Sequence, residues 1–454
     1  MDTGSGSGIS QDELDAFHRT VGLLRALPVD DPVRLRAEQV AASFARDGRL
    51  RRRKERDAQA SAADAAAMAA TSTGAVDRRE DAPLVPAGDA VGDAVGDAGV
   101  YRKPRGCYIC KSSYRQVDSF YHRLCPRCAA DNRSRRALST DLSGRRALVT
   151  GGRVKIGFQL ALMMLRDGAE LLVTSRFPHD TVRRFQEAPG SEKWLDRLTV
   201  VAVDLRDPRQ VLGFCEELRQ EGEPLDILVN NAAQTVRRPV ESYALLAAGE
   251  YDALPEGARR APGFTPMRML ESGAASLPVA LREADEAGLL PDPSPENSWS
   301  ARLGDLDPAE VLETQLVNAL APALLCDRLL PLLLASPNPR RYVVNVTAVE
   351  GRFAVRNKMA GHPHTNMAKA ALNMLTRTSA AELAEQGVHM CAVDTGWITD
   401  ENPAPKKARM AGAGFRTPLD IVDGAARVYD PIVRGEAGDP VSGVFLKDYR
   451  EAAW

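Results

Sequence analysis

The chain has 454 residues, of which 44% are hydrophobic and 26% are charged, and its net charge is -2 at neutral pH. It therefore has enough apolar side chains for a sizeable core and more than one domain. A charge so near zero argues against a protein that coats nucleic acid along its whole length. No apolar run predicts a membrane span or a leader peptide. Cys215, Cys326 and Cys391 stand singly among apolar neighbours, as is usual in a reducing compartment. We expect a cytoplasmic protein with no membrane contact.

Residues 1–57 are predicted to form a helical N-terminal segment. Ser10 is a candidate N-cap and Glu13 is spaced for a capping box. Two prolines separate this first helix from a second helix, whose basic end is interpreted as solvated rather than bound to nucleic acid. Residues 58–100 are rich in Ala, Gly and Asp, as in "GDAVGDAVGDAG", and predict a disordered linker because they offer few large apolar side chains for burial.

Two pairs of cysteines follow within "CYICKSSYRQVDSFYHRLCPRC", each pair in the form C-x2-C with fourteen residues between the pairs. Tetrahedral zinc takes four thiolate ligands, and two such pairs can supply them. We predict a structural Zn²⁺ site in a module of residues 101–140. Its ligands would be Cys107, Cys110, Cys125 and Cys128. Disulfides or a redox pair are the alternatives, and His122 is an alternative fourth ligand.

The predicted zinc module is basic and carries several aromatic side chains. Arginines such as Arg133, Arg135 and Arg136 outnumber the acidic side chains Asp118 and Asp131. The module could bind nucleic acid through phosphate neutralisation and base stacking. Alternatively the aromatic side chains pack around the metal, and the module docks on a protein partner. The second interpretation is favoured slightly.

From about residue 141 to residue 454, apolar strands alternate with helical patterns. The expected strands are "RRALVTG", "AELLVTSR", "LTVVAVDL", "DILVNNAA", "RYVVNVTA", "HMCAVDTG" and "SGVFLKDY". This alternation predicts an α/β fold, a Rossmann-type doubly wound parallel sheet of seven strands. Residues 235–306 are rich in Pro, Gly and charge, and form an insertion after the fourth strand; segments of such length are usually functional or disordered.

A glycine-rich turn, "ALVTGGRVKIG", joins the first of these strands to a helix. Such a turn lets the backbone approach phosphate oxygens at a helix N-terminus. Further motifs follow this turn along the chain: "DL" at 204–205, "NNAA" at 230–233, Asn318 and "TGWI" at 395–398. In their type and order these motifs resemble those of the short-chain dehydrogenase/reductase family, and the resemblance covers most of residues 144–454. The resemblance implies a nicotinamide dinucleotide site. Its residues would be Thr150, Gly151, Gly152, Arg153, Lys155, Ile156, Gly157, Arg176, Asp204, Leu205, Asn231, Ala232, Lys369, Gly396 and Ile398.

Two arginines indicate which dinucleotide binds. Arg176 follows the second strand, where an acidic residue would bind a ribose 2′-hydroxyl and an arginine a 2′-phosphate. Arg153 lies in the turn near the same end of the ribose, so NADP(H) is favoured over NAD(H). Lys155 occupies the family's middle glycine position, where its side chain would either obstruct the nucleotide or lie along the phosphates.

The catalytic end departs from the family. There a serine and a tyrosine contact the substrate carbonyl, and a lysine one helical turn after the tyrosine lowers the pKa of the phenol. Here Ala348 takes the serine position and Thr365 the tyrosine position, whereas Lys369 and Asn318 match. An aliphatic hydroxyl titrates far above a phenol, so Thr365 is a poor proton donor at neutral pH.

Three explanations stay open. His364 or His362 supplies the proton, although His364 is turned about a hundred degrees around the helix from Thr365. In the second explanation, a side chain of the insertion supplies the proton. Its candidates are Glu241, Tyr243, Tyr251, Arg259, Arg260 and Trp299. In the third explanation the domain is an inactive nucleotide-binding regulator or scaffold, whose zinc module docks a protein or nucleic acid.

We expect an enzyme, an NADP(H)-dependent oxidoreductase acting on a small-molecule carbonyl or alcohol with a non-standard proton donor. Its catalytic residues would be Asn318, Lys369, Thr365 and His364. The family resemblance also implies a homo-oligomer.

Overall fold

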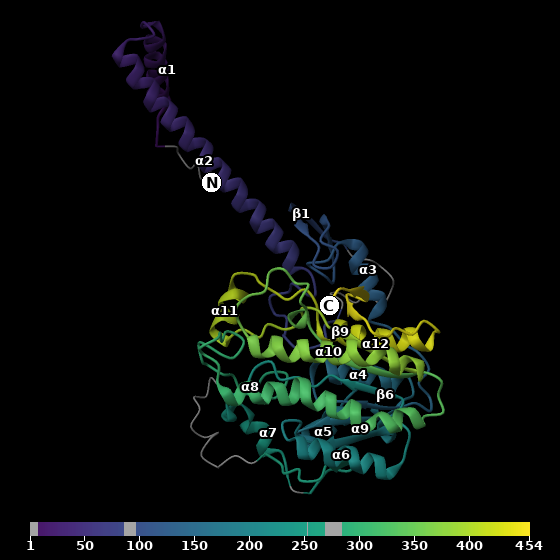
Figure 1. The fold of residues 1–454 in the computed structure, drawn as a ribbon. Coiled ribbons are helices and arrows are strands. Elements are labelled where there is room, and N and C mark those ends of the chain that lie inside the picture. The colour runs from purple at the N-terminus through teal and green to yellow at the C-terminus, as the bar shows by residue number, and fades with distance from the viewer. Residues whose placement is uncertain (1–7, 86–96, 252, 268–283) are drawn as a thin grey trace. The chain divides into compact units, whose positions relative to one another are not determined.

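The structure is a computed structural model that describes residues 8–85, 97–251, 253–267 and 284–454 (Figure 1). Its described residues fall into two compact units. The first belongs to residues 1–66 with 101–103, and the second to residues 67–100 with 104–454.

Two helices make up most of the first unit, α1 (Gln11–Ala26) and α2 (Pro32–Ala69). The predicted capping box is confirmed, because Ser10 Oγ accepts the Glu13 N–H at 3.3 Å and the Glu13 carboxylate accepts the Ser10 N–H at 2.7 Å. The prediction of a disordered linker from residue 58 was wrong for residues 58–69, which continue α2. Alanine has the highest helix propensity, so "SAADAAAMA" needs no large apolar side chain to be helical.

The rest of the predicted linker is also partly ordered. Residues 71–84 form hydrogen bonds and ion pairs with the second unit's other segments, and residues 97–100 begin strand β1 (Asp97–Gly106). Residues 86–96 lie outside the described residues. We call the predicted zinc module, residues 101–140, the cysteine module. In it, β1 pairs antiparallel with β2 (Ser113–Asp118), and α3 (Pro126–Arg135) follows.

A nine-stranded sheet forms the centre of the second unit, in the order β11-β10-β9-β8-β6-β3-β4-β5-β7. All seven predicted strands are present. They are β3 (Arg146–Val149), β4 (Glu170–Ser175), β5 (Leu198–Ala202), β6 (Ile227–Asn230), β8 (Arg341–Thr347), β9 (Val388–Asp394) and β10 (Phe445–Lys447). The predicted number of seven was too low. Two edge strands of three residues, β7 (Ala258–Arg260) and β11 (Arg450–Ala452), have no long apolar pattern that would reveal them. The sheet is parallel except at β11, which is antiparallel to β10.

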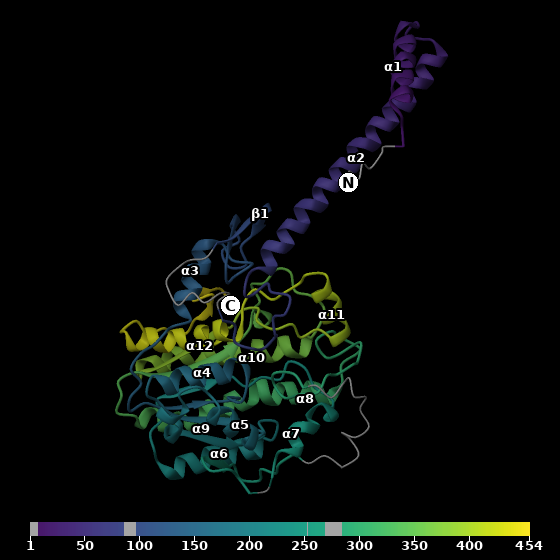
Figure 2. The same cartoon turned by 180° about the vertical axis from the view of Figure 1, so that it is seen from behind.

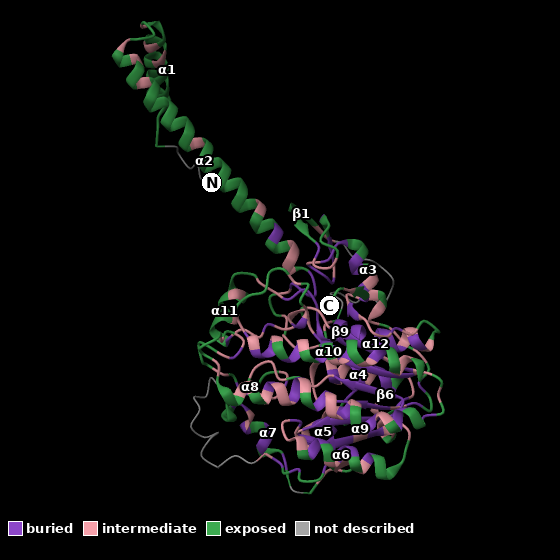
Figure 3. Ribbon diagram, viewed as in Figure 1, coloured by how far each residue is buried: buried purple, intermediate pink, exposed green. Residues whose placement is uncertain are grey.

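Helices cover both faces of this sheet, and the strands between them are buried (Figure 3). One face packs on α4 (Lys155–Arg166), α5 (Pro178–Gln186) and α12 (Ile421–Glu436), and the other on α6 (Pro208–Glu221), α9 (Ala321–Ala335) and α10 (Pro363–Glu385). Helices α4 and α12 lie side by side in both views, as do α6 and α9 (Figures 1 and 2). The doubly wound architecture is therefore confirmed.

Shorter elements connect these layers. They are α7 (Ala244–Ala248), α8 (Pro308–Gln315), α11 (Ala404–Gly412), η1 (Ser191–Lys193), η2 (Leu195–Arg197), η3 (Val240–Tyr243), η5 (Leu316–Leu320) and η6 (Val349–Gly351). The continuous helical run Pro308–Ala335 is long and apolar enough to cross a membrane by length and composition, but half of its most apolar window is buried inside the fold. Its α9 portion packs against α6 as a core helix of the domain.

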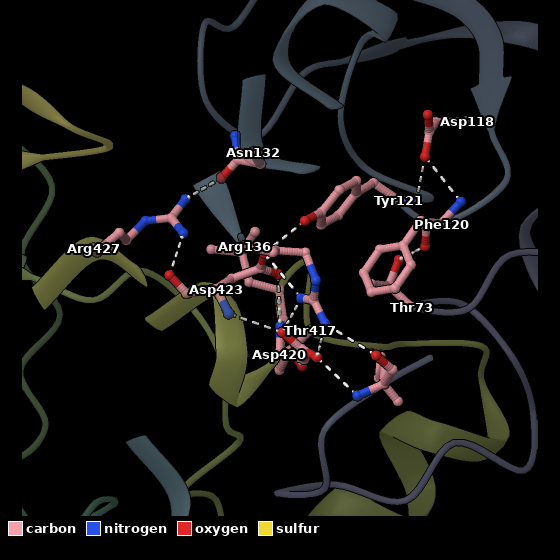
Figure 4. A network of polar contacts seen from close by, with 12 residues as sticks. Thr73, Asp118, Phe120, Tyr121, Asn132, Arg136, Thr417, Asp420, Asp423 and Arg427 are labelled. Carbon is pink, nitrogen blue, oxygen red and sulfur yellow. Dashed lines mark hydrogen bonds and ion pairs between the residues drawn. The ribbon is translucent and has the colours of Figure 1, made fainter. Parts of the chain in front are cut away.

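A buried polar network joins the cysteine module to α12 (Figure 4). The Arg136 guanidinium lies 2.6 Å from an Asp420 oxygen and 3.1 Å from an Asp423 oxygen, and the Tyr121 hydroxyl donates to Asp423 at 2.6 Å. On the same helix, Arg427 donates to the side-chain oxygen of Asn132 at 2.8 Å. Burial acts to raise the pKa of Asp420, but the positive charge of Arg136 outweighs burial, so this pKa lies below its ordinary value. The pKa of Asp423 is raised by burial and by the negative charge of Asp420.

A candidate nucleotide-binding and catalytic site

The glycine-rich turn after β3 is tightly closed around the end of β6. Thr150 Oγ1 accepts the backbone N–H groups of Asn231 and Ala232, both at 3.0 Å, and the Asn231 amide donates to Thr150 O at 2.9 Å and to Gly151 O at 3.2 Å. A Cβ atom at Gly157 would lie 2.2 Å from Gly151 O, so only glycine fits. These contacts position the backbone as a phosphate-binding turn requires.

Helix α4 begins at Lys155, directly after this turn. Its N-cap residue, Val154, makes no side-chain capping bond, so the first N–H groups of the helix are available to an anion. Lys155 adopts φ +55°, the left-handed conformation that glycine favours. Its ammonium lies 2.9 Å from the Asp81 carboxylate. Burial acts to lower the pKa of Lys155, but Glu401, Asp81 and Asp285 outweigh it and the pKa is raised.

The two arginines expected at the ribose have different surroundings. Arg153 is engaged, because its guanidinium lies 2.7 Å from an Asp180 oxygen and donates to Ala287 O at 2.7 Å. Arg176 lies over the aromatic rings of Phe177 and Tyr243, 5.6 Å and 5.2 Å from their centroids. No hydrogen bond or ion pair holds Arg176 within the described part of the chain, so its guanidinium is the one available to a phosphate.

Two predicted residues at the adenine end, Asp204 and Leu205, follow β5. The Asp204 carboxylate binds Arg206 through two oxygens, at distances from 2.6 to 3.0 Å, and the Asp204 N–H donates to the Gln210 side chain at 2.9 Å. These bonds fix the loop backbone. Leu205 is buried beneath it.

The "TGWI" turn follows β9 and is held from both sides. Gly396 adopts φ +84°, and its N–H donates to Asp394 Oδ1 at 2.6 Å. The N–H of the next residue, Trp397, donates at 2.8 Å to the hydroxyl of Tyr108, which stands between the first two cysteines of the module. Ile398 is buried against α12, where a Cβ atom at Gly424 would lie 2.3 Å from its Cδ1 atom.

Three residues that stand at catalytic positions of the family are all buried. Lys369 and Thr365 lie on α10 and Asn318 lies in the π-helical turn η5, with exposed fractions of 5%, 2% and 1%. Single π-helical turns inside helices often occur at functional sites. Asn318 bonds both main-chain groups of Gln234, at 2.7 Å and 2.9 Å. The Thr365 hydroxyl has no hydrogen-bond partner among the described residues.

Lys369 reaches the carboxyl end of β8, where its ammonium donates to Val346 O at 3.0 Å. Burial lowers the pKa of Lys369 to about 8, although Glu350 opposes this shift. The parallel strands β3, β6, β8 and β9 all end at this edge of the sheet. The glycine-rich turn, the "TGWI" turn and Lys369 therefore lie on the same side of the fold.

The histidines near Thr365 have distinct environments. His364 is fully buried, neither ring nitrogen has a hydrogen-bond partner among the described residues, and Nε2 lies 4.0 Å from Glu310. Burial lowers the pKa of His364, although Glu310 opposes this shift. His362 precedes α10 with φ +44°, and its ring stacks on Trp299 of the insertion with centroids 3.8 Å apart.

The described parts of the insertion thus contribute to both ends of the candidate site. Trp299 contacts His362, whereas Tyr243 stacks on Phe177 at 5.9 Å beside Arg176. Arg259 instead forms an ion pair with Glu221 at the edge of the sheet. The ion pair between Asp81 and Lys155 could not be found from the sequence. Asp81 lies in residues 58–100, which were predicted to be a disordered linker from their composition.

The four module cysteines come together as predicted. Their sulfur atoms all lie within 4.8 Å of one another, and those of Cys110 and Cys125 are 3.7 Å apart. Four sulfurs at about 2.3 Å from one ion would lie roughly 3.8 Å apart at the corners of a tetrahedron, so this donor set fits zinc. His122 is not a fourth ligand; its Nδ1 lies 2.7 Å from the Thr73 hydroxyl, and burial lowers its pKa to about 3.

Three arginines of the module are held by carboxylates inside the fold. Arg133 lies 2.6 Å from Asp118, Arg135 lies 2.5 Å from Asp430, and Arg136 binds Asp420 and Asp423. An arginine held by buried carboxylates is not available to phosphate groups. The contacts of these three arginines therefore do not support the nucleic-acid interpretation.

Comparison with known proteins places the chain in a family. The short chain dehydrogenase family matches residues 145–248, and a family described as Enoyl-(Acyl carrier protein) reductase matches residues 293–413. An uncharacterised protein of Acanthamoeba polyphaga mimivirus is 31% identical over 347 residues, which cover 72% of this chain and 71% of that protein. Gluconate 5-dehydrogenase of Gluconobacter oxydans is 33% identical over 105 residues, which cover 23% of this chain and only 39% of that enzyme.

Two solved structures are among those similar to this chain. A short chain dehydrogenase from Burkholderia cenocepacia, in complex with NADP, is 22% identical with a TM-score of 0.46; the match covers 68% of this chain and 97% of that one. An NADPH-bound carbonyl reductase from chicken fatty liver is 18% identical with a TM-score of 0.43, and covers 68% of this chain and 99% of that one. The chain belongs to the short-chain dehydrogenase/reductase family.

Proposed function

We propose that the protein is a cytosolic NADP(H)-dependent oxidoreductase that interconverts a small-molecule carbonyl and its alcohol. The observation that carries this proposal is Lys369, a buried amine with a pKa of about 8 that lies at the same edge of the sheet as the glycine-rich turn. A general acid is most effective when its pKa is close to the working pH.

Lys369 itself is the proposed proton donor. When bound, the nicotinamide supplies or accepts the hydride. The Lys369 ammonium gives its proton to the carbonyl oxygen in reduction, and the neutral amine takes a proton from the alcohol in oxidation. Asn318 positions the chain around Gln234. The phosphate end is formed by the turn of Thr150, with Arg176 on the 2′-phosphate.

Reductive turnover with NADPH is expected to fall as the pH rises above about 8, by roughly tenfold per pH unit, because the proton-donating ammonium of Lys369 is lost. Lys369→Met is expected to lower kcat about a hundredfold or more. NADPH-consumption assays over a panel of aldehydes and ketones would measure both effects. His364→Gln is the matched variant, and a pH profile that moves with His364→Gln rather than with Lys369 would identify the histidine as the donor.

Arg176→Ala is expected to weaken NADPH binding by roughly tenfold to a hundredfold and to leave NADH binding unchanged, because the arginine contacts only the 2′-phosphate. Calorimetric titration with the two nucleotides would measure this. Arg183→Ala removes a nearby exposed arginine that pairs with Asp180, and serves as the control. An equal loss for both nucleotides would contradict the assignment of the 2′-phosphate to Arg176.

A second candidate function is supported by Thr365. Its buried hydroxyl, without a partner in the described structure, is a weak acid where the family has a phenol. This favours a nucleotide-binding regulator or scaffold, with the cysteine module carrying structural Zn²⁺ and docking a protein partner, within a homo-oligomer. Tight NADP(H) binding without turnover on any substrate of the panel would favour this second function.

A further inference from the structure

Residues 77–84, which we call the strap, contact the glycine-rich turn through one residue. Arg78 donates to Thr417 O at 2.5 Å and to Leu419 O at 2.6 Å, in the loop before α12. At the other end of the strap, the Leu84 N–H donates to Asp420 Oδ2 at 2.8 Å. The strap is therefore anchored on both sides of the residue that reaches the turn.

That residue is Asp81. Its Oδ2 atom lies 2.9 Å from the ammonium of Lys155, the first residue of α4, and the exposed fraction of the Asp81 side chain is 13%. Glu401 and Asp285 add further negative charge around the same ammonium. A carboxylate thus pairs with the side chain of the first residue of α4. Members of this family bind the nucleotide pyrophosphate at the N-terminus of this helix, and a phosphate near the same ammonium would be repelled by the carboxylate.

The conformation of Asp81 is costly. Its φ is +65°, in the left-handed region that residues other than glycine rarely adopt. Its second oxygen, Oδ1, is buried and has no hydrogen-bond partner among the described residues. Strained backbone and unpaired buried polar atoms mark segments that function requires rather than segments that stability alone would select.

We propose that the strap is an autoinhibitory element, in which Asp81 occupies the place of a nucleotide phosphate on Lys155 and must leave before the dinucleotide binds. This inference rests on the proposed function and deepens it, since it assigns a regulation to the same site. Lys155 then exchanges one anion for another: the Asp81 carboxylate in the closed state and a phosphate in the open state. The cation that replaces the family's glycine has a role in both states.

Asp81→Asn is expected to tighten NADP⁺ binding about tenfold, because the competing charge is removed while the shape of the side chain is kept. Asp77→Asn removes the same charge from an exposed position of the same strap and should leave the affinity unchanged. Calorimetric titration of the full chain with NADP⁺, alongside thermal melting of each variant, would measure this. Equal or weaker binding by Asp81→Asn would overturn the strap proposal alone, whereas no binding by any of the three proteins would overturn the proposed function with it.

A second measurement needs no variant. Trypsin cuts after arginine, and the strap contains Arg78 and Arg79 in sequence. Saturating NADP⁺ should speed cleavage after these two residues in the wild-type protein, as followed by mass spectrometry, because the strap is displaced. Slower cleavage would overturn the proposal, since it would mean that the strap closes over bound nucleotide.

Discussion

Replacement of Arg136 by methionine is expected to lower the free energy of unfolding by about 3 to 5 kcal/mol, the usual cost of removing one partner from a buried ion pair. The side chains of Asp420 and Asp423 are fully buried, and Arg136, with an exposed fraction of 15%, bonds both. Without the guanidinium, two neighbouring carboxylates would remain in a site shielded from water. Denaturant unfolding followed by circular dichroism would measure the change.

The matched control for this experiment is Arg434→Met. Arg434 also contacts a carboxylate through two nitrogens, but its partner Asp439 is 72% exposed. Exposed pairs of this kind stabilise proteins by about 1 kcal/mol or less. If both variants lost the same free energy of unfolding, burial would not be the reason why the network between the cysteine module and α12 stabilises the protein.

Loss of a metal ligand is the second large effect. Wild-type protein purified without chelator is expected to hold about one zinc ion per chain, and Cys128→Ser to lose it. We expect the melting temperature to fall by roughly 6 to 12 °C, as about 3 kcal/mol of stability would give. The reason is that Cys128 lies on α3, which also carries Asn132 and Arg135, the residues that contact α12.

Elemental analysis and thermal melting would be measured on the same samples. Cys326→Ala serves as the control because Cys326 lies far along the chain on α9 and is not part of the cysteine cluster. Its metal content should equal that of the wild type. Wild-type protein that contains no metal after growth in zinc-supplemented medium, or a Cys128→Ser variant that melts as the wild type does, would contradict this account.

The sequence predicted those parts of the fold whose signals are local. Seven apolar strands and the turn from Thr150 to Gly157 each carry their pattern within about ten residues, and the two C-x2-C pairs do so within the module. The short edge strands β7 and β11 were missed because three residues cannot show a period. The end of α2 was missed because alanine, which favours helices, also dominated the composition that suggested a linker.

The strap could not be predicted for a different reason. Arg78 bonds Thr417, and Asp81 bonds Lys155, across long separations in sequence that no periodic pattern encodes. The hydrogen bond between Tyr108 and Trp397 could not be predicted for the same reason. It places the first pair of module cysteines beside the "TGWI" turn. At the catalytic end, the sequence identified Lys369 and the absent phenol at Thr365, but not the burial that moves the pKa of Lys369 toward neutrality.

The network of Figure 4 has a consequence for where this protein can be divided. A shortened chain that starts at residue 144 would retain the entire nine-stranded sheet and all the residues that the two family descriptions match. It would also strip α12 of every counter-charge supplied by Arg135 and Arg136. Such a chain is therefore expected to be less stable than one that also contains the cysteine module.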